Sequence, residues 1–340
     1  KLGNKEKSLE LNKKTYQLRC EFFGENHPDT LTSLSNLAVA YGELGNNDKE
    51  LELLEKAYKF QCVAIGETHP GTLTSLNNLA NAYKHSGNYA KALELQQNVY
   101  NTCCDVLGKK HRTTLSALGN LIVIYDNLGD NAKVLELLKK LYKLQCEAFG
   151  EKNSETIMTL RDLACVYKDL EDYTKSLELY KKVYAISCEA LGEKHPDTLL
   201  LFNGFSFVYD KLGNYNKELQ LTKKAYQLHC EVYGEEHIDT LAALHNLAFA
   251  YMQLEDYGNA TPLNEKLYRS RCNVLGEKHL STLTSLNNLA YCYDKLGDYV
   301  RAVELQEKLY SHRCEVLGID DPQTIKSLER LNLFKSKTEN

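Results

Sequence analysis

Apolar residues recur along this chain at three- and four-residue steps, in stretches that end at glycine. The first complete stretches carry Leu31, Leu34, Leu37, Ala38, Tyr41 and Leu44, then Leu51, Leu54, Tyr58, Cys62 and Ile65. Such steps place apolar side chains on one face of an α-helix, and the Lys and Glu residues between them on a solvated face. Because Gly45-Asn46 separates the stretches, the pattern predicts a hairpin of two helices that ends at Gly66.

The hairpin pattern returns every 42 residues without an insertion. One glycine marks the same position in each copy: Gly24, Gly66, Gly108, Gly150, Gly192, Gly234, Gly276 and Gly318. A fixed period of this length is typical of a stacked array, in which each unit buries its apolar face against its neighbours. The sequence therefore predicts an all-α array of hairpins.

The loop before each first helix holds recurring polar residues. Asp29 and Thr30 follow His27-Pro28 and are residue types that cap helices, so we expect the first helix to start there. Six units carry a loop histidine, namely His27, His69, His111, His195, His237 and His279. These histidines lie one unit apart and cannot converge on one metal ion, so we expect each to form a hydrogen bond within its own loop.

Three places depart from the repeated pattern. The turns at Glu171-Asp172 and Glu255-Asp256 have to form without the glycine of the other units. Pro262 stands inside a second helix, where most other units carry Glu. Proline removes a helical hydrogen bond and clashes with the preceding turn. We therefore expect this helix to start late or to kink near Thr261.

Composition and charge narrow the functional classes. A net charge of −5 with interspersed signs argues against a nucleic-acid partner. The chain has no apolar run long enough for a membrane span and no signal-peptide pattern at its start, so we expect a cytoplasmic protein without a membrane partner. Cysteines in one column of stacked units lie too far apart to pair. We find no phosphate loop, no metal motif and no catalytic set, and we expect no enzyme activity, cofactor or metal.

The repeat resembles a known family. Leu286, Leu289, Ala290, Tyr293, Gly297-Asp298-Tyr299 and Ala302 follow the tetratricopeptide repeat pattern. Gly-Glu-Lys-His-Pro-Asp-Thr-Leu at 192–199 and Leu-Asn-Asn-Leu-Ala at 76–80 and 286–290 are similar to its 42-residue variety, found in kinesin light chains. The resemblance implies a right-handed α-solenoid of antiparallel helix-turn-helix hairpins. It covers essentially the whole chain, and it indicates fold more than function.

We expect residues 1–340 to form a single array. Its predicted parts are an opening half-repeat with a second helix only (1–29), full repeats at 30–71, 72–113, 114–155, 156–197, 198–239, 240–281 and 282–323, and a closing helix at 324–340. Leu2-Gly3-Asn4 aligns with the inter-helix turn Leu212-Gly213-Asn214, so the chain opens inside a repeat. Additional repeats or another domain before residue 1 are therefore possible partners of this segment.

One face of the first helix is neutral where a solvated face would be charged. In the first unit it comprises Thr32, Asn36 and Val39, and of the twenty-one residues in the seven copies only Asp162 is charged. The resemblance implies that this face lines a concave groove, in which asparagines hold the backbone of an extended peptide. An asparagine side chain offers both a donor and an acceptor for this purpose.

The candidate groove residues are asparagines, three aromatic residues and one cation. They are Asn36, Asn77, Asn78, Asn81, Asn120, Arg161, Asn203, Phe207, Asn246, Phe249, Asn287, Asn288 and Tyr291. The aromatic residues lie in the later units, so we expect that half to take apolar side chains of a partner and the earlier half its backbone. The competing interpretation is that these residues only pack between neighbouring first helices.

Three functions are compatible with this pattern. We expect a protein–protein interaction scaffold or adaptor that binds a peptide or a partner surface in the groove. A sensor or regulatory arm of a larger enzyme, such as a nucleoside triphosphatase or a protease, is the alternative. A passive structural spacer is the third.

Overall fold

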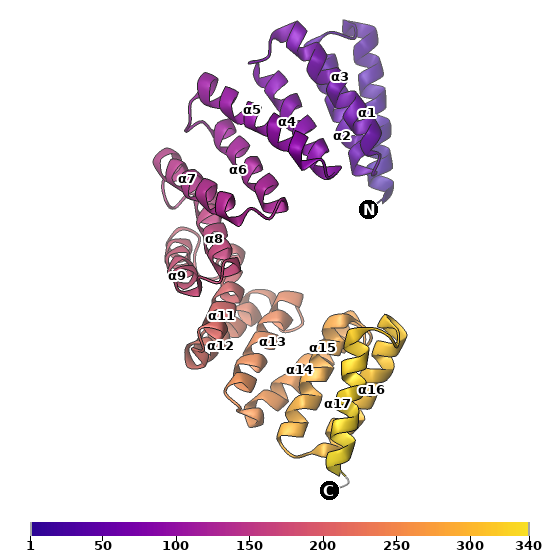
Figure 1. Ribbon diagram of the computed structural model, residues 1–340, viewed down its shortest axis with the longest axis vertical. Coiled ribbons are helices and arrows are strands. Elements are labelled where there is room, and N and C mark those ends of the chain that lie inside the picture. Colours follow the sequence, from indigo (N-terminus) through magenta and orange to yellow (C-terminus); the bar gives the residue numbers. More distant parts are fainter. Residues whose placement is uncertain (1, 339–340) are drawn as a thin grey trace. The chain divides into compact units, whose positions relative to one another are not determined.

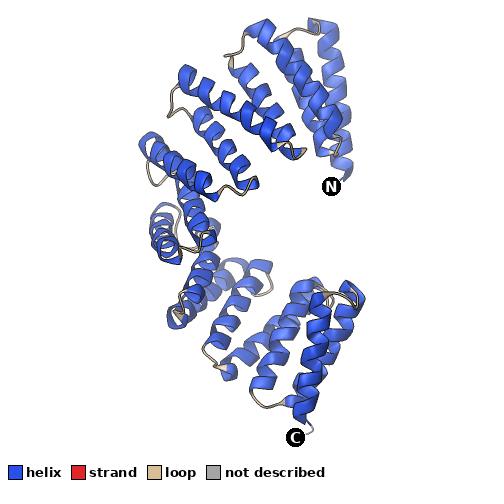
Figure 2. Ribbon diagram, in the orientation of Figure 1, coloured by secondary structure: helices blue, strands red, loops and turns tan. Residues whose placement is uncertain are grey.

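The computed structural model describes residues 2–338, and all regular elements among them are α-helices joined by short loops (Figures 1 and 2). The chain divides into two compact units, called the first and the second unit below, of which the first ends at Val166 and the second begins at Tyr167. The 42-residue copies are called repeats. The predicted all-α architecture of consecutive hairpins is confirmed. The assignment of residues 1–340 to one continuous array, with the boundaries given above, stays a prediction.

The first unit contains seven helices and most of an eighth. These are α1 (Leu2–Phe23), α2 (Pro28–Glu43), α3 (Asn47–Ile65), α4 (Pro70–His85), α5 (Tyr89–Leu107), α6 (Arg112–Asn127), α7 (Asn131–Phe149) and α8 (Ser154–Asp169). Leu2–Asn4 belong to α1, whereas the aligned residues Leu212–Asn214 connect α11 and α12.

The second unit contains the remaining helices. These are α9 (Tyr173–Ala190), α10 (Pro196–Leu199), α11 (Leu201–Lys211), α12 (Tyr215–Tyr233), α13 (Ile238–Gln253), α14 (Tyr257–Leu275), α15 (Leu280–Lys295), α16 (Tyr299–Leu317) and α17 (Pro322–Thr338). Leu200 alone separates α10 from α11, and its right-handed backbone makes the two one nearly continuous first helix. In the first unit consecutive helices from α1 to α7 contact one another, and in the second unit consecutive helices from α9 to α17 do so. Helix α11 also contacts α13, the first helix of the following hairpin.

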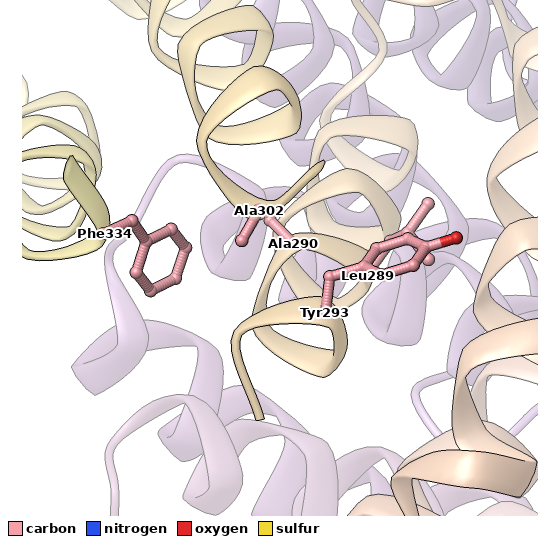
Figure 3. Close-up of a cluster of buried hydrophobic side chains, with 5 residues drawn as sticks. All are labelled: Leu289, Ala290, Tyr293, Ala302 and Phe334. Carbon is pink, nitrogen blue, oxygen red and sulfur yellow. The ribbon is translucent and has the colours of Figure 1, made fainter. Parts of the chain in front are cut away.

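The core of the hairpin of α15 and α16 closes around small residues. Ala290 of α15 and Ala302 of α16 are fully buried and lie together with Leu289, Tyr293 and Phe334 (Figure 3). Alanine at both positions lets the two helix backbones approach closely, while the leucines around them supply the apolar area. A fully buried leucine stabilises the fold by about 1.5–3 kcal/mol.

The loop histidines are helix caps, which corrects the expectation that Asp29 and Thr30 fulfil this role. Helix α2 begins at Pro28, and His27 Nδ1 accepts the backbone N–H of Asp29 at 3.2 Å. All six predicted loop histidines accept the equivalent bond, so their predicted hydrogen bonds are confirmed. The Thr30 hydroxyl is buried and donates to the carbonyl of Arg19 at 3.2 Å, which ties the first helix to the preceding one.

The turns without glycine adopt the same backbone as the glycine turns. Glu171 and Glu255 have φ of 61° and 57°, in the left-handed region that Gly297 enters with φ of 81°. The backbone N–H of Asp256 donates to the carbonyl of Tyr251 at 3.0 Å, as at the corresponding glycine turns. The fold thus imposes this conformation on glutamate, which pays a steric cost there that glycine does not.

Pro262 does not delay its helix, and that part of the expectation is wrong. Helix α14 begins at Tyr257, five residues before the proline, and Asp256 caps it. The residue whose carbonyl loses its hydrogen bond, and that the proline ring approaches, is Gly258. A glycine at that position leaves the backbone room to adjust, and the Thr261 hydroxyl donates to the carbonyl of Tyr257 at 2.7 Å.

Candidate functional site

The neutral face of the first helices is open to solvent. We call the positions of Thr32, Asn36 and Val39 in every repeat the candidate face. None of its described residues is fully buried. Its large apolar members are well exposed, with 37% of the Val39 residue surface, 43% of that of Phe207 and 36% of that of Phe249 accessible to solvent. This exposure does not fit the competing interpretation, in which the residues of the candidate face only pack between neighbouring first helices.

The asparagines at the edge of this face bond across neighbouring first helices. In each pair the two residues are 43 positions apart, which is one repeat and one residue. We call this row of pairs the polar seam. Its bonds run from Asn120 Nδ2 to Asn77 Oδ1 (2.7 Å), from Asn246 Nδ2 to Asn203 Oδ1 (3.0 Å) and from Arg330 Nη1 to Asn287 Oδ1 (3.0 Å).

The seam uses only part of each asparagine. A side-chain amide has two N–H donors and a carbonyl with two lone pairs, and one bond to a neighbour consumes one of these. Asn120, Asn203, Asn246 and Asn287 are half-buried or exposed. The seam therefore fixes the orientation of these amides and leaves donors and acceptors for a ligand.

A pocket of about 430 Å³ lies on the candidate face of the second unit. Asn203 and Phe207 of α11 form one wall, and Asn246 and Phe249 of α13 form the other. Four of the residues predicted from the sequence thus come together around one cavity. Two rings and two amides give it an apolar surface with a few oriented polar groups, which is typical of a binding site.

The floor of this pocket contains a buried carboxyl group. Glu218 of α12 is 1% exposed, and its Oε1 accepts the hydroxyl of Ser206 at 2.9 Å. Its Oε2 is buried and has no hydrogen-bond partner among the described residues. Burial raises the pKa of Glu218 to about 7, and the nearby Asp210 adds to the rise.

A histidine and an arginine complete the lining. Burial lowers the pKa of His245 to about 4, with a further contribution from the charge of Arg271, and no described residue bonds to its Nδ1. The Arg271 guanidinium is 8% exposed and donates to Ser281 O at 2.9 Å and Ser285 Oγ at 2.7 Å. Arg19 and Arg313 make the equivalent pair of hydrogen bonds in other repeats, so Arg271 has a structural role.

In the first unit the predicted residues are more dispersed. Asn77 and Asn120 line a cavity of about 120 Å³ formed by α4, α5 and α6. Asn81 accepts a hydrogen bond from Lys84 at 3.2 Å. Asn36 is exposed and Asn78 is half-buried.

The Arg161 guanidinium donates to its neighbour Asp162 at 3.3 Å, so an adjacent carboxylate offsets its charge.

The last predicted residues lie on α15, away from the pocket. Asn288 is half-buried. The Tyr291 ring contacts Tyr257 edge-on and has Arg330 at 5.7 Å and Lys295 at 5.4 Å from its centroid. The structure thus groups Asn203, Phe207, Asn246 and Phe249 and leaves Tyr291 as a separate aromatic position.

Sequence reasoning missed the floor of the pocket. Ser206 and Glu218 stand in columns where the same face of later repeats has Ala248 with Ala260 and Ala290 with Ala302. Those four alanines are fully buried. The sequence does show that two polar residues replace an alanine pair within one repeat. The meaning of this replacement is clear only when the structure shows that the two columns face each other.

Comparisons with known proteins agree with the repeat pattern. The profile of the tetratricopeptide repeat matches residues 1–62, 71–147, 113–189, 155–231 and 239–315, which together cover most of the chain. No curated protein matches the sequence. No helix among residues 2–338 is long and apolar enough to cross a membrane.

Several solved structures are similar. The repeats of a putative kinesin light chain from Podosopora anserina align with a TM-score of 0.54 and 25% identity, over 61% of this chain and 98% of that one. BtubC from P. vanneervenii aligns with a TM-score of 0.55 and 16% identity, over 68% and 91%. A signal transduction ATPase with a tetratricopeptide repeat sensor, from Pyrococcus horikoshii, aligns with a TM-score of 0.67 and 15% identity, over 96% of this chain and 50% of that one. The last two likenesses show the fold alone.

Proposed function

The chain belongs to the tetratricopeptide repeat family, whose repeats generally mediate protein–protein interaction, and we propose that it is an adaptor that binds a partner segment along the candidate face. The proposed binding residues are the thirteen candidates named from the sequence, with the pocket of the second unit as their centre. We propose binding without catalysis, in the cytoplasm.

The pocket between α11 and α13 carries this proposal. Phe207 and Phe249 expose a large part of their rings although burial of either ring would stabilise the fold. Asn203 and Asn246 stand beside them with their orientation fixed by a mutual bond. Exposed rings beside oriented amides are typical of the anchor positions of interfaces, where aromatic side chains contribute most of the affinity.

A passive spacer has no need of this arrangement. A spacer is served by packing alone, and three repeats pack with an alanine pair at the positions of Ser206 and Glu218. The sensor or regulatory arm of a larger enzyme stays a prediction, because the likeness to the ATPase sensor concerns the fold.

The test is a peptide-display selection against the whole chain, followed by affinity measurement of the selected peptides. We expect the triple variant Asn246→Ala, Asn288→Ala, Phe249→Ala to weaken binding at least about tenfold, because it removes one anchor ring and two amides. Val300→Ala is the matched control, since Val300 is an exposed apolar residue on the second helix α16. Unchanged affinity in the triple variant contradicts the proposal.

A further inference from the structure

We propose that the pocket formed by α11, α12, α13 and α14 receives one positively charged side chain, a lysine or an arginine, of the partner segment. This inference rests on the proposed function and specifies the chemistry of the central position.

Ser206 and Glu218 stand where the later repeats have a buried alanine pair, and these alanines have no exposed surface. Placing a carboxyl group in such a contact is strongly unfavourable unless the group is paired. Packing alone therefore does not account for Glu218, and its neighbours in the fold give it only the Ser206 hydroxyl.

One carboxyl oxygen of Glu218, Oε2, is left without a hydrogen bond among residues 2–338, and Glu218 lines the pocket. Above about pH 7 Glu218 is ionised, and a carboxylate is an acceptor only, so the group that satisfies Oε2 there has to be a donor. A donor that also carries a positive charge forms a hydrogen bond about twice as strong as a neutral one.

The charges that surround Glu218 favour a cation. From α11, Asp210 faces the same pocket and adds a second carboxylate, which accepts a hydrogen bond from Gln253 of α13 at 2.6 Å and lies 3.8 Å from the Lys211 ammonium group. From α13, His245 stays neutral because burial lowers its pKa to about 4. From α14, Arg271 is already engaged by two acceptors of α15.

The walls fit the stem of such a side chain. Lysine and arginine bury their methylene groups along apolar surface while the charged head reaches a polar group. Phe207 and Phe249 provide that surface at the mouth, and an aromatic face also attracts a cation. Phe207 already has Lys211 at 5.4 Å from its ring centroid, which illustrates this contact within the fold.

The chain contains its own comparison residue. Glu50 of α3 occupies the column of Glu218, is 6% exposed and has its pKa raised by burial. Its carboxyl group fills the space beside Gly42, where a Cβ would lie 2.2 Å from Oε2. In the first unit the carboxyl group thus occupies the space itself, whereas Glu218 lines an open cavity.

The experiment measures peptide binding by two-dimensional NMR on the whole chain. The probes are acetylated, amidated pentapeptides with two alanines on each side of a central arginine, lysine, norleucine or glutamate. We expect the arginine and lysine peptides to bind at least about tenfold more tightly than norleucine, with resonance shifts at Phe207 and Phe249. The preference is expected to be larger at about pH 8 than at about pH 5.5, because protonation of Glu218 removes its charge.

Three variants test the assignment to Glu218. Glu218→Gln is expected to abolish the preference for the cationic peptides, and Glu50→Gln to leave it unchanged. The double variant Ser206→Ala, Glu218→Ala recreates the alanine pair of the later repeats, so it is expected to fold and to show no preference. A preference that survives in both Glu218 variants overturns the proposal.

The remaining outcomes separate this inference from the proposed function. If all four peptides bind equally and Phe249→Ala weakens their binding, the cation pocket is overturned and the adaptor function still holds. Tighter binding of the glutamate peptide, or no binding of any probe, also overturns the cation pocket. Peptides from the display selection that bind independently of the candidate face contradict the adaptor function itself.

Discussion

Single residues decide where this repeat protein departs from its template. The histidine before each first helix is a cap, and its role is shared by other residue types. Asn153 accepts the backbone N–H of Glu155 at 3.0 Å, and Asp321 accepts that of Gln323 at 2.8 Å. Any side chain with an acceptor at the right distance therefore satisfies this position, which predicts which substitutions the loop tolerates.

We predict that His237→Ala destabilises the second unit by about 1 kcal/mol, because the N–H of Asp239 loses its acceptor. His237→Asn is expected to preserve the cap, as Asn153 does in its own loop. Thermal unfolding and hydrogen exchange at the first turn of α13 measure both effects. The ring of His237 also stacks on Tyr233 at 4.7 Å, so equal losses in both variants would assign the effect to stacking.

Glu218 makes stability depend on pH. Its pKa in the folded chain is raised from 4.5 to about 7, so between these values the folded state binds more protons than the unfolded state. Stability then falls as pH rises through this window, by up to about 3 kcal/mol. We predict that Glu218→Gln is stabilised relative to wild type at pH 8 and not at pH 4.

The comparison of unfolding free energies at the two pH values isolates this effect, because His245 is present in both proteins and its own titration cancels. A difference between variant and wild type that does not change with pH would contradict the raised pKa of Glu218.

At the scale of elements, the turns between helices are set by geometry more than by residue type. Glu255 and Gly297 hold equivalent turns with left-handed backbones, and the hydrogen bonds around them match. A Cβ built on Gly297 meets no atom within 4 Å, so the only cost of a side chain there is conformational. The two turns are therefore a matched pair in which the cost of this conformation can be measured.

We predict that Glu255→Gly stabilises the second unit by about 1 kcal/mol and that Gly297→Glu destabilises it by a similar amount. Differential scanning calorimetry of the two single variants and the double exchange measures the changes. The double exchange is expected to be nearly neutral. Shifts of the same sign in both single variants would show that contacts, not backbone strain, control these turns.

At the scale of the whole molecule, the 42-residue period makes the fold predictable from the sequence but does not reveal the pocket. Each column of the repeat has one environment, so Leu31 and its counterparts identify the helical faces without any coordinates. The candidate face was predictable in the same way, from the absence of charge. The pocket floor was not, because Ser206 and Glu218 lie on opposite sides of a contact that the one-dimensional period does not reveal. The sequence identifies the capping histidines as loop residues, but only the structure shows that their Nδ1 atom accepts the backbone N–H two residues later.

The spacing of the polar seam has a consequence for how such chains are recombined. Each seam bond joins one repeat to the next through a donor on the later repeat and an acceptor on the earlier one. A whole 42-residue cassette can therefore be duplicated or deleted with the other seam bonds conserved, provided that the two residues at the new junction match. Beside the apolar packing between hairpins, the compatibility of two spliced repeats then includes one donor–acceptor question, such as whether Asn203 meets an amide like that of Asn246 or a residue without one.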